Sequence, residues 1–456
     1  MAPSEPTGGS PHPYIPATEA DRARMLERVG VADVDALFAD LPAAVLDPTI
    51  HLPPALAEPE LVELLAERAA ANAVAGRPDF LGAGAYRHSI PAVVAHLTAR
   101  SEFVTAYTPY QPEISQGTLQ SAFEYQSVVC ELSGLDVSNT GLYDGASATA
   151  EACLLASRVT KRSAVALLEP IHPGTADVVG TYARGAGLRV DVLQTPEAVR
   201  ADHACLVVQQ PDFLGAIVDL EPIAEGLHAD GVLLVAVADP FALGMLRAPG
   251  DAGADIVTGE GRDLAGPPQS GGPSLGLFAG RSTFLRQMPG RIVGRTRELH
   301  APPGGGEPRT GYVLTLQARE QFIRRERATS NVSTAQSLIA LAFTITLQAL
   351  GPRGLREAAE LSYQRAHDAA RRIAALDGFE TPERGPWFSE FLVRGPMPAA
   401  ELAAALRARG IGPGFDVSDR PEPEARQALL FSVTEATPEA HTDALVEALA
   451  EIGGAA

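Results

Sequence analysis

The sequence predicts an α/β protein built on a mostly parallel β-sheet with helices on both faces, joined to a smaller α+β domain. Two observations carry this prediction. Short apolar runs alternate with helical stretches from residue 164 onward, which is typical of a parallel sheet covered on both sides. After residue 350 the pattern becomes a mixture of helices and a few further strands. The predicted parts are an N-terminal extended and helical arm (1–65), a large domain (66–350) and a small C-terminal domain (351–456).

Each element follows from a local pattern. The predicted strands of the large domain are short apolar runs, at residues 164–168, 189–193, 204–209, 231–238, 256–258 and 275–279. Its predicted helices lie before and between these strands, at residues 61–75, 119–132, 145–158, 175–185 and 220–229. In the small domain the sequence predicts strands and helices at residues 355–376, 392–394, 399–409, 428–433 and 438–452. Residues 318–350 read as a long helical region broken near Ser330, and residues 295–310 as a proline- and glycine-rich loop without a packing signal.

The composition excludes several classes of function. A formal net charge of −20 argues against a nucleic-acid partner, because such affinity comes from Lys and Arg that neutralise phosphates. The ten histidines have no metal-ligand spacing, so no metal is expected. The first 18 residues lack the basic and apolar regions of a signal peptide, and no apolar run approaches the ~20 residues that cross a bilayer. We therefore expect a cytoplasmic protein without a membrane partner.

Two segments are predicted to be loops that expose polar side chains. Residues 107–117, YTPYQPEISQG, contain two prolines and cannot form a regular helix or strand. Residues 82–84, Gly-Ala-Gly, are a weak phosphate-binding signal, because no third glycine follows at the required spacing. We expect instead a tight turn that directs Tyr86 and His88 toward a cleft.

Longer segments resemble a known family. They read YTPYQPEISQGTLQSAFEYQ, YDGASATAEA, VAVADP, GADIVTGEG, RQMPGRIVG and YVLTLQAREQFIRRERATSN. In this order they are similar to the α subunit (subunit 1) of the two-subunit glycine decarboxylase, the P-protein of the glycine cleavage system. The resemblance runs from about residue 24 to near residue 449, so it covers most of the chain.

The order of elements suits the type I fold of pyridoxal phosphate (PLP) enzymes, the aspartate aminotransferase-like fold. There an aspartate at a strand end holds the pyridinium nitrogen, and Asp239 occupies the comparable place. A lysine must also form the Schiff base, but Lys161 is the only lysine of the chain and lies far from the loop after residue 258. That loop contains Arg262, whose guanidinium stays protonated and cannot form the imine. The chain is therefore either inactive or completed by a lysine from a partner.

The start of the helix at 145–158 has two interpretations. A beginning rich in Gly, Ser and Thr is a good phosphate cradle. Asp144 at the cap, however, takes the same N–H donors and repels an anion. Asp144 and Ser147 are thus either a vestigial phosphate loop or a plain capped helix.

The resemblance implies a division of labour. The sister β subunit supplies the lysine and holds most of the PLP, and the α subunit completes the pocket in an (αβ)2 heterotetramer that is inactive without β. The loop residues expected to face the PLP, the glycine and the lipoyl arm of the H-protein are Tyr107, Tyr110, Gln111, Glu113, Ser115, Gln116 and Gly117. Of these, Tyr107, Tyr110 and Glu113 are the first catalytic candidates, because a phenol or carboxylate can transfer a proton to the dithiol. Alternatively, some of the seven only pin the loop.

Other residues leave alternatives open. One cluster either receives a carboxylate or phosphate or is a solvated helix face paired to acids. Its members are Arg319, Arg324, Arg325 and Arg327, with Ser330, Asn331 and Thr334. Ser270, Ala335 and the enlarged 295–310 loop depart from the family pattern. These departures leave room for a paralogous subunit that acts on another small amino acid, and a non-catalytic scaffold subunit is a further alternative. The function expected first is glycine decarboxylation and aminomethyl transfer to the lipoyl group.

Overall fold

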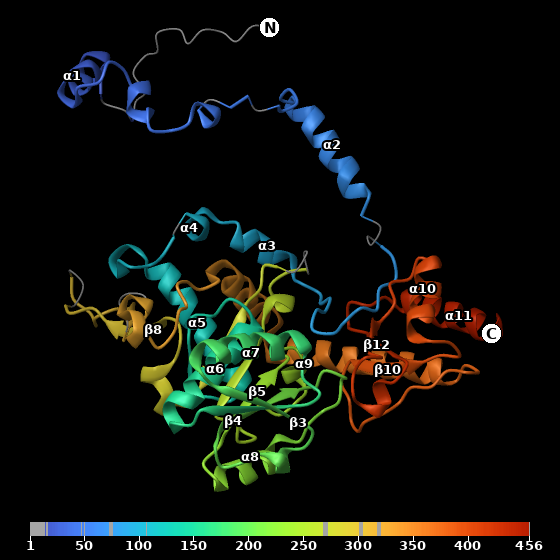
Figure 1. The fold of residues 1–456 in the computed structure, drawn as a ribbon. Helices are drawn as coiled ribbons and strands as arrows, with labels where there is room; N and C mark the ends of the chain where they lie inside the picture. The colour runs from blue at the N-terminus through green and yellow to red at the C-terminus, as the bar shows by residue number, and fades with distance from the viewer. Residues whose placement is uncertain are drawn as a thin grey trace. The chain divides into compact units, whose positions relative to one another are not determined.

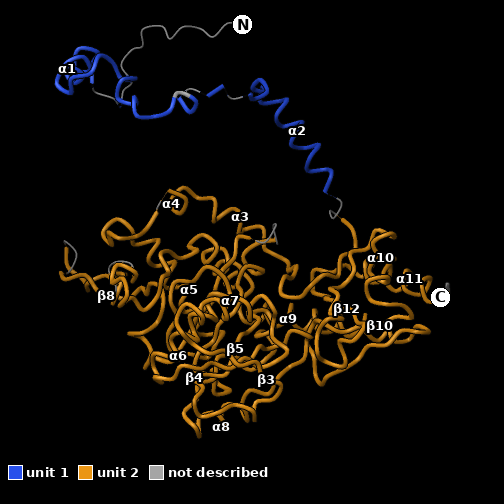
Figure 2. The backbone as a smooth tube through the Cα atoms, viewed as in Figure 1, with its two compact units in different colours: residues 1–73 blue, residues 74–456 orange. Residues whose placement is uncertain are grey.

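The computed structural model describes Tyr14 and residues 17–455, apart from residues 47, 50, 73–75, 106, 268–271, 301–303 and 317–320. Contacts between Cα atoms divide the chain into two units, residues 1–73 and 74–456, which are blue and orange in Figure 2. The predicted division into three parts, at residues 65 and 350, stays a prediction.

The first unit consists of short helices joined by extended segments. Its two α-helices are α1 (Glu19–Val29) and α2 (Glu58–Ala70), and neither buries a residue within the described part of the chain. Thr18 caps α1: its hydroxyl accepts the Asp21 N–H at 3.2 Å, while the Asp21 carboxylate accepts the Thr18 N–H at 2.9 Å. The helix predicted at residues 61–75 is α2, which begins three residues earlier and ends at Ala70.

The second unit contains a seven-stranded sheet with the order β1-β7-β6-β5-β4-β2-β3. Its strands β3, β4 and β5 are labelled in Figure 1. Its strands are β1 (Val137–Ser138), β2 (Ala164–Leu168), β3 (Arg189–Leu193), β4 (His203–Gln210), β5 (Leu233–Ala238), β6 (Ile256–Glu260) and β7 (Gly276–Gly280). Neighbouring strands from β3 to β6 are parallel, whereas β7 pairs antiparallel with β6 and with β1. The mostly parallel sheet predicted from the sequence is confirmed.

Helices cover both faces of this sheet, as predicted. They are α5 (Gln116–Ser133), α6 (Gly145–Thr160), α7 (Pro173–Ala186), α8 (Leu220–Ala229) and α9 (Ser337–Ala374). Successive strand residues point to opposite faces. Leu206 and Val208 of β4 therefore pack in a core with α5, α8 and α9, whereas Cys205 and Val207 pack with α6 and α7. The carboxyl ends of the parallel strands lie at one edge of the sheet between these helical layers.

The helix α9 is kinked where Gly351, at φ 64°, precedes Pro352. Among the helices in the described ranges, it is the one long and apolar enough to cross a membrane by length and composition. Its side chains Phe343 and Leu347, however, are buried in the core against the sheet. This burial is the pattern of a core helix.

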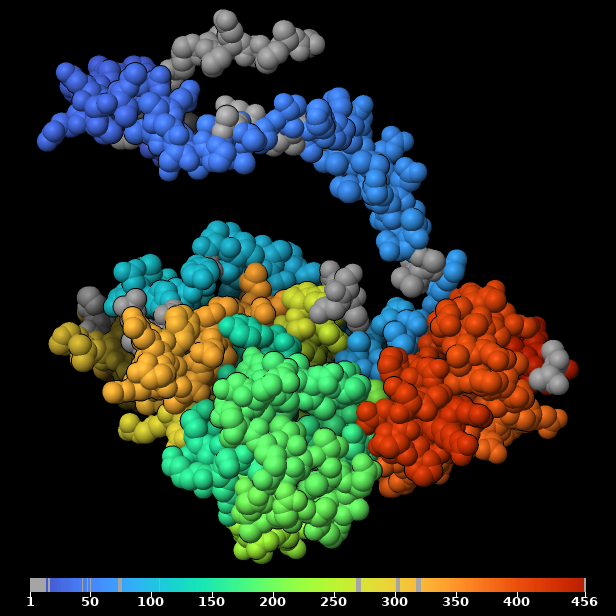
Figure 3. All heavy atoms as spheres, in the orientation of Figure 1, coloured from blue at the N-terminus to red at the C-terminus, as the bar shows by residue number. Residues whose placement is uncertain are grey.

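The C-terminal part of the second unit is a smaller α+β layer, orange to red in Figure 3. Its elements are β10 (Glu390–Arg394), α10 (Ala399–Ala408), β11 (Phe415–Asp416), β12 (Ala428–Ser432) and α11 (Glu439–Ala455). The strands form an antiparallel sheet with the order β10-β12-β11. The sequence predicts all of these elements except β11, which has only two residues.

The loop predicted at residues 295–310 is present in its described residues between 298 and 309, where it connects β8 (Ile292–Arg297) with β9 (Thr310–Thr315), and only its end residues belong to the strands. The helix predicted to begin at residue 318 is wrong. The expected helix from 318 is, over residues 321–327, a distorted 3-10 segment, η8, and α9 starts only at Ser337. The hairpin depends on distant contacts: the Gln126 amide of α5 bonds to both backbone groups of Val293, at 2.8 and 3.0 Å.

Candidate active-site pocket

A pocket of about 570 Å³ opens at the carboxyl ends of β4, β5 and β6. In open parallel sheets this edge is where ligands bind. The wall combines residues that follow the strands, the N-terminal ends of α6 and α7, residues 83–88 and the start of β10. Acidic side chains dominate its polar lining, namely Asp144, Asp239, Glu260, Asp263 and Glu390.

Asp239 follows β5 directly and lies on the pocket wall, where the sequence places it. One carboxylate oxygen accepts the Phe241 N–H at 2.9 Å, which fixes the side chain. Desolvation in the pocket raises the pKa of Asp239, and the electrostatic interaction with His88 and the Phe241 N–H oppose this rise. A role for Asp239 toward a cofactor stays a prediction.

Arg262 occupies the loop after β6 in which a Schiff-base lysine was sought. Its Nε donates to Asp263 Oδ1 at 2.9 Å, and its Nη2 donates to the Gly84 carbonyl at 3.0 Å. Burial opposes the guanidinium charge, but the Asp263 carboxylate outweighs burial and raises the pKa of Arg262. Lys161 is exposed at the far end of α6 and does not line the pocket. The described wall of the pocket therefore has no amine that could form an imine.

The N-terminal end of α6 is already filled by carboxylates. Asp144 caps the helix as predicted, and its Oδ1 accepts the Ser147 N–H at 2.7 Å. Glu260, which no sequence pattern singled out, accepts the Gly145 N–H at 3.1 Å. A phosphate at this helix end would need the donors that these side chains use. PLP therefore does not fit this pocket, because it would lack both its lysine and its phosphate site.

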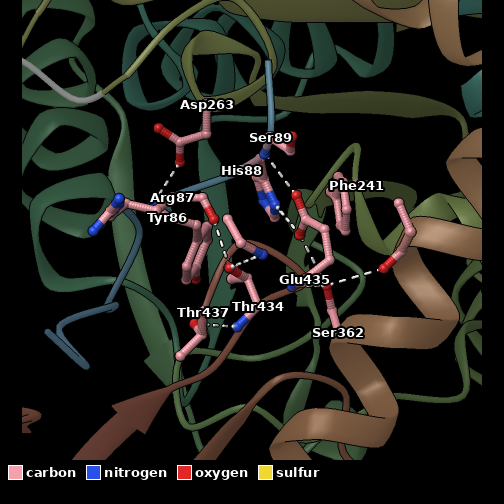
Figure 4. Close-up of polar contacts among 12 residues, drawn as sticks. Tyr86, Arg87, His88, Ser89, Phe241, Asp263, Ser362, Thr434, Glu435 and Thr437 are labelled. Atoms are coloured by element: carbon pink, nitrogen blue, oxygen red, sulfur yellow. Dashed lines mark hydrogen bonds and ion pairs between the residues drawn. The ribbon is translucent and has the colours of Figure 1, made fainter. Parts of the chain in front are cut away.

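Tyr86 and His88 lie in the pocket wall, as the turn at residues 82–84 predicts (Figure 4). The Tyr86 hydroxyl donates to Glu390 Oε2 at 2.8 Å, and its N–H donates to Asp263 Oδ2 at 2.9 Å. His88 stacks on Phe241, with ring centroids 3.7 Å apart at 18°. These contacts hold the segment against the sheet edge, while a role of either side chain toward a substrate stays a prediction.

Glu435 anchors the same segment from the C-terminal part of the unit (Figure 4). Its carboxylate lies 2.9 Å from His88 Nδ1 and accepts the Ser89 N–H at 2.7 Å and the Ser362 hydroxyl at 3.0 Å. Burial opposes its charge, but the hydrogen bond and charge of His88, together with the other donors, lower the pKa of Glu435. His88 and Glu435 are 347 residues apart in the chain, so local sequence carried no signal for this contact.

Glu390 is expected to make stability fall as the pH rises. Burial raises its pKa from 4.5 to about 7. Between these values the folded state holds the proton and the unfolded state has lost it, so the free energy of unfolding falls by up to about 3 kcal/mol from pH 4.5 to pH 7. Thermal unfolding of Glu390→Gln between about pH 5 and pH 8 should show a smaller decrease than the wild type.

The matched control is Glu401→Gln at an exposed position of α10, which should keep the wild-type pH dependence. An unchanged pH dependence in Glu390→Gln would contradict the assignment. Space at this carboxylate is tight, because a Cβ on Gly82 would lie 2.3 Å from Glu390 Oε1. The amide of the variant has nearly the same volume and keeps an acceptor for the Ala83 N–H. Its NH2 group cannot accept the Tyr86 hydroxyl, so the readout is the pH dependence of stability and not the absolute Tm.

The loop of residues 107–117 is separate from this pocket, and none of its described residues lines the wall. Tyr107 is 90% exposed, and the Glu113 side chain is also exposed. Two residues hold the loop in place. The Gln116 side-chain amide bonds to the N–H and the carbonyl of Tyr312, both at 2.9 Å. The guanidinium carbon of Arg291 lies over the Tyr110 ring, 5.1 Å from the ring centroid. Gln111 and Gly117 are exposed and Ser115 is half-buried. The predicted site residues thus form two groups, a pocket group and an exposed loop.

The arginine cluster is also at the surface. Arg324, Arg325 and Arg327 are exposed on η8, and Arg319 lies outside the described residues. Ser330 is buried and donates to Glu151 Oε1 at 2.8 Å. This contact gives Ser330 a structural role and leaves the arginines accessible.

The family profile of the glycine cleavage system P-protein matches residues 12–449. The chain belongs to this family. A relative from Anoxybacillus flavithermus, named probable glycine dehydrogenase (decarboxylating) subunit 1, is 44% identical, covering 96% of this chain and 99% of its own. A relative of the same name from Rhodospirillum centenum is 46% identical, with 96% and 99% covered.

Solved structures agree with this family assignment. The chain is similar to glycine decarboxylase (P-protein) of the glycine cleavage system in inhibitor-bound form, with a TM-score of 0.84 and 42% identity, covering 97% of this chain and 100% of that one. A sphingosine-1-phosphate lyase from Burkholderia pseudomallei shares the fold at a TM-score of 0.63 and 15% identity, covering 90% and 94%. The predicted fold class is confirmed.

Proposed function

We propose that this P-protein family chain is the α subunit of a two-subunit glycine decarboxylase and acts only together with a PLP-holding β subunit. The observation that carries the proposal is the pocket, in which Arg262 stands in the loop searched for a lysine and Glu260 fills the helix end that a phosphate would need. A chain with such a pocket cannot hold the cofactor in a working form. The name "subunit 1" of its relatives supports the need for a partner.

The exposed loop of residues 107–117 is the contribution that we propose for this subunit. Tyr107 and Glu113 make no hydrogen bond with their side chains inside the described part of this chain, so both are available to a partner. We infer that the loop covers the active site of the β subunit in an (αβ)2 assembly. There it excludes water, orients glycine and gives a proton to the thiolate that is released when the lipoyl disulfide of the H-protein accepts the aminomethyl group and its S–S bond breaks.

Reconstitution tests the proposal. The purified chain alone is expected to give no glycine–bicarbonate exchange and, with added PLP, no imine absorbance band. Adding a β subunit and lipoylated H-protein should produce both signals. The proposal is rejected if the pair exchanges no bicarbonate, or if the chain alone forms a stable imine.

The same assay addresses the substrate. Ser270 lies outside the described residues, and Ala335 is half-buried and does not line the pocket. We expect glycine to be preferred over alanine and serine. Faster decarboxylation of either competitor would favour a paralogous enzyme.

A further inference from the structure

We propose that the Glu260 carboxylate is a built-in anion that occupies the phosphate cradle of this chain. The observation is a ring of three backbone donors that converge on one side chain. Its Oε1 accepts the Arg262 N–H at 2.9 Å and the Leu275 N–H at 2.8 Å. Its Oε2 accepts the Gly145 N–H at 3.1 Å. These donors come from the start of α6, the loop after β6 and the segment before β7.

The ring has the chemistry of an anion site rather than of an ordinary turn. The 16-residue helix α6 directs its positive end at the carboxylate. Burial raises the pKa of Glu260, and the N–H groups of Leu275, Gly145 and Arg262 oppose this rise because they favour the ionised, acceptor-only form. Backbone also approaches closely here: a Cβ on Gly145 would lie 2.9 Å from the Glu260 nitrogen. A side chain at position 145 would separate helix and strand and open the ring.

Neighbouring charges reinforce the exclusion of a second anion. Asp144 takes the Ser147 N–H, so the first turn of α6 carries two carboxylates. Arg262, a cation of the same wall, is committed to Asp263 and the Gly84 carbonyl. A phosphate that approached would meet like charge and find its donors taken. The pocket therefore has room for a ligand, but its acidic side chains and its occupied N–H donors disfavour a phosphorylated one.

The role of Glu260 rests on the proposed function in one respect, because its bond to the Gly145 N–H is also part of the observation that carries that function. Phosphate binding is measured on this chain without a β subunit, so its failure is distinguishable from a failure of reconstitution. The side chain accepts from three backbone N–H groups, of which those of Gly145 and Arg262 belong to residues that line the pocket. If the side chain were removed, the same three N–H groups would donate to the oxygens of a small tetrahedral anion. The ligand class of the emptied cradle is therefore a phosphate monoester or inorganic phosphate.

Thermal unfolding of the full chain tests the inference, with inorganic phosphate compared with chloride at equal ionic strength. The wild type is expected to show no specific response to phosphate. Glu260→Ala should unfold at a lower temperature, and millimolar phosphate should raise its Tm saturably by roughly 2–4 °C. PLP should act like phosphate on this variant, whereas pyridoxal, which lacks the phosphate, should not.

Two further variants keep the test decisive. Glu260→Gln fills the space and keeps Oε1 as an acceptor. Its Tm should therefore fall less than that of Glu260→Ala, and phosphate should not raise it. Glu390→Gln changes another carboxylate of the same pocket that is bonded to Ala83 and Tyr86, and it should also gain none. If Glu260→Ala cannot be purified in the folded state, the yield of refolding is measured instead of Tm. This yield should be higher in phosphate than in chloride. A wild type stabilised by phosphate to the same degree, or a Glu260→Ala variant indifferent to it, overturns the inference.

Discussion

Replacing Glu113 with glutamine is expected to lower glycine–bicarbonate exchange by the assembled enzyme about 10²-fold, the usual contribution of a general acid or base. Glutamine keeps the shape of the side chain and loses only the transferable proton. The carboxylate is exposed, so folding of the chain should not change. The measurement is the exchange rate at saturating glycine and H-protein, with assembly checked by sedimentation.

The control for this prediction lies on the following helix. Glu124→Gln changes another exposed carboxylate, which accepts from Gln120 on α5, and the exchange rate should stay within about twofold of the wild type. Tyr107→Phe should reduce the rate without weakening assembly if its hydroxyl orients a reactant. Full activity of Glu113→Gln would show that Glu113 does not transfer a proton in the reaction. It would favour the alternative in which this chain is a non-catalytic scaffold subunit.

Replacing Arg420 with methionine is expected to lower the free energy of unfolding by about 3–5 kcal/mol, the range for breaking a buried ion pair from one side. Arg420 pairs with Glu169 and Glu422, and all three side chains are largely buried. Its guanidinium also lies 5.5 Å from the centre of the Phe213 ring. Methionine retains part of the packing but leaves two buried carboxylates without their cation. Urea unfolding monitored by circular dichroism measures the change.

An exposed ion pair supplies the comparison for this second prediction. Arg353 and Glu357 pair at 2.7 Å on the surface of α9, and Arg353→Met should cost less than about 0.5 kcal/mol. Two variants with equal losses would show that the buried network contributes no more than a surface pair. Removing Glu169 together with Arg420 should recover part of the loss, because one uncompensated charge then disappears.

Most of the central sheet could be predicted because buried parallel strands read as uninterrupted apolar runs. The run AVALL at 164–168 is buried throughout and coincides with β2 to the residue. The segment RVDVL at 189–193 also coincides with β3, although this edge strand is only partly buried and contains two charged residues. The missed strands lack such runs. β1 has two residues, and the β8–β9 hairpin is held by the Gln116 and Gln126 amides of α5. Contacts between distant segments cannot be read from local periodicity.

The candidate site divides in the same way. Asp239, Arg262 and Asp144 could be placed because each follows a strand or precedes a helix, which are positions that the chain order defines. Glu260 was missed although it ends β6 and lies two residues before Arg262, because its role depends on N–H groups from three segments. Glu390 and Glu435 meet residues 80–90 across the whole unit, so only the folded chain brings them together. The roles of the loop residues 107–117 stay predictions.

The position of Lys161 has a practical consequence for labelling. It is the one lysine of the sequence, it is exposed, and it ends α6 about 24 Å along the helix axis from Gly145. Amine-reactive probes therefore have a single side-chain target in this subunit, remote from the pocket. In a borohydride-reduced assembly, any pyridoxyl-lysine peptide that does not contain Lys161 must originate from another polypeptide, so mass spectrometry can assign the cofactor-bearing subunit without separating the chains.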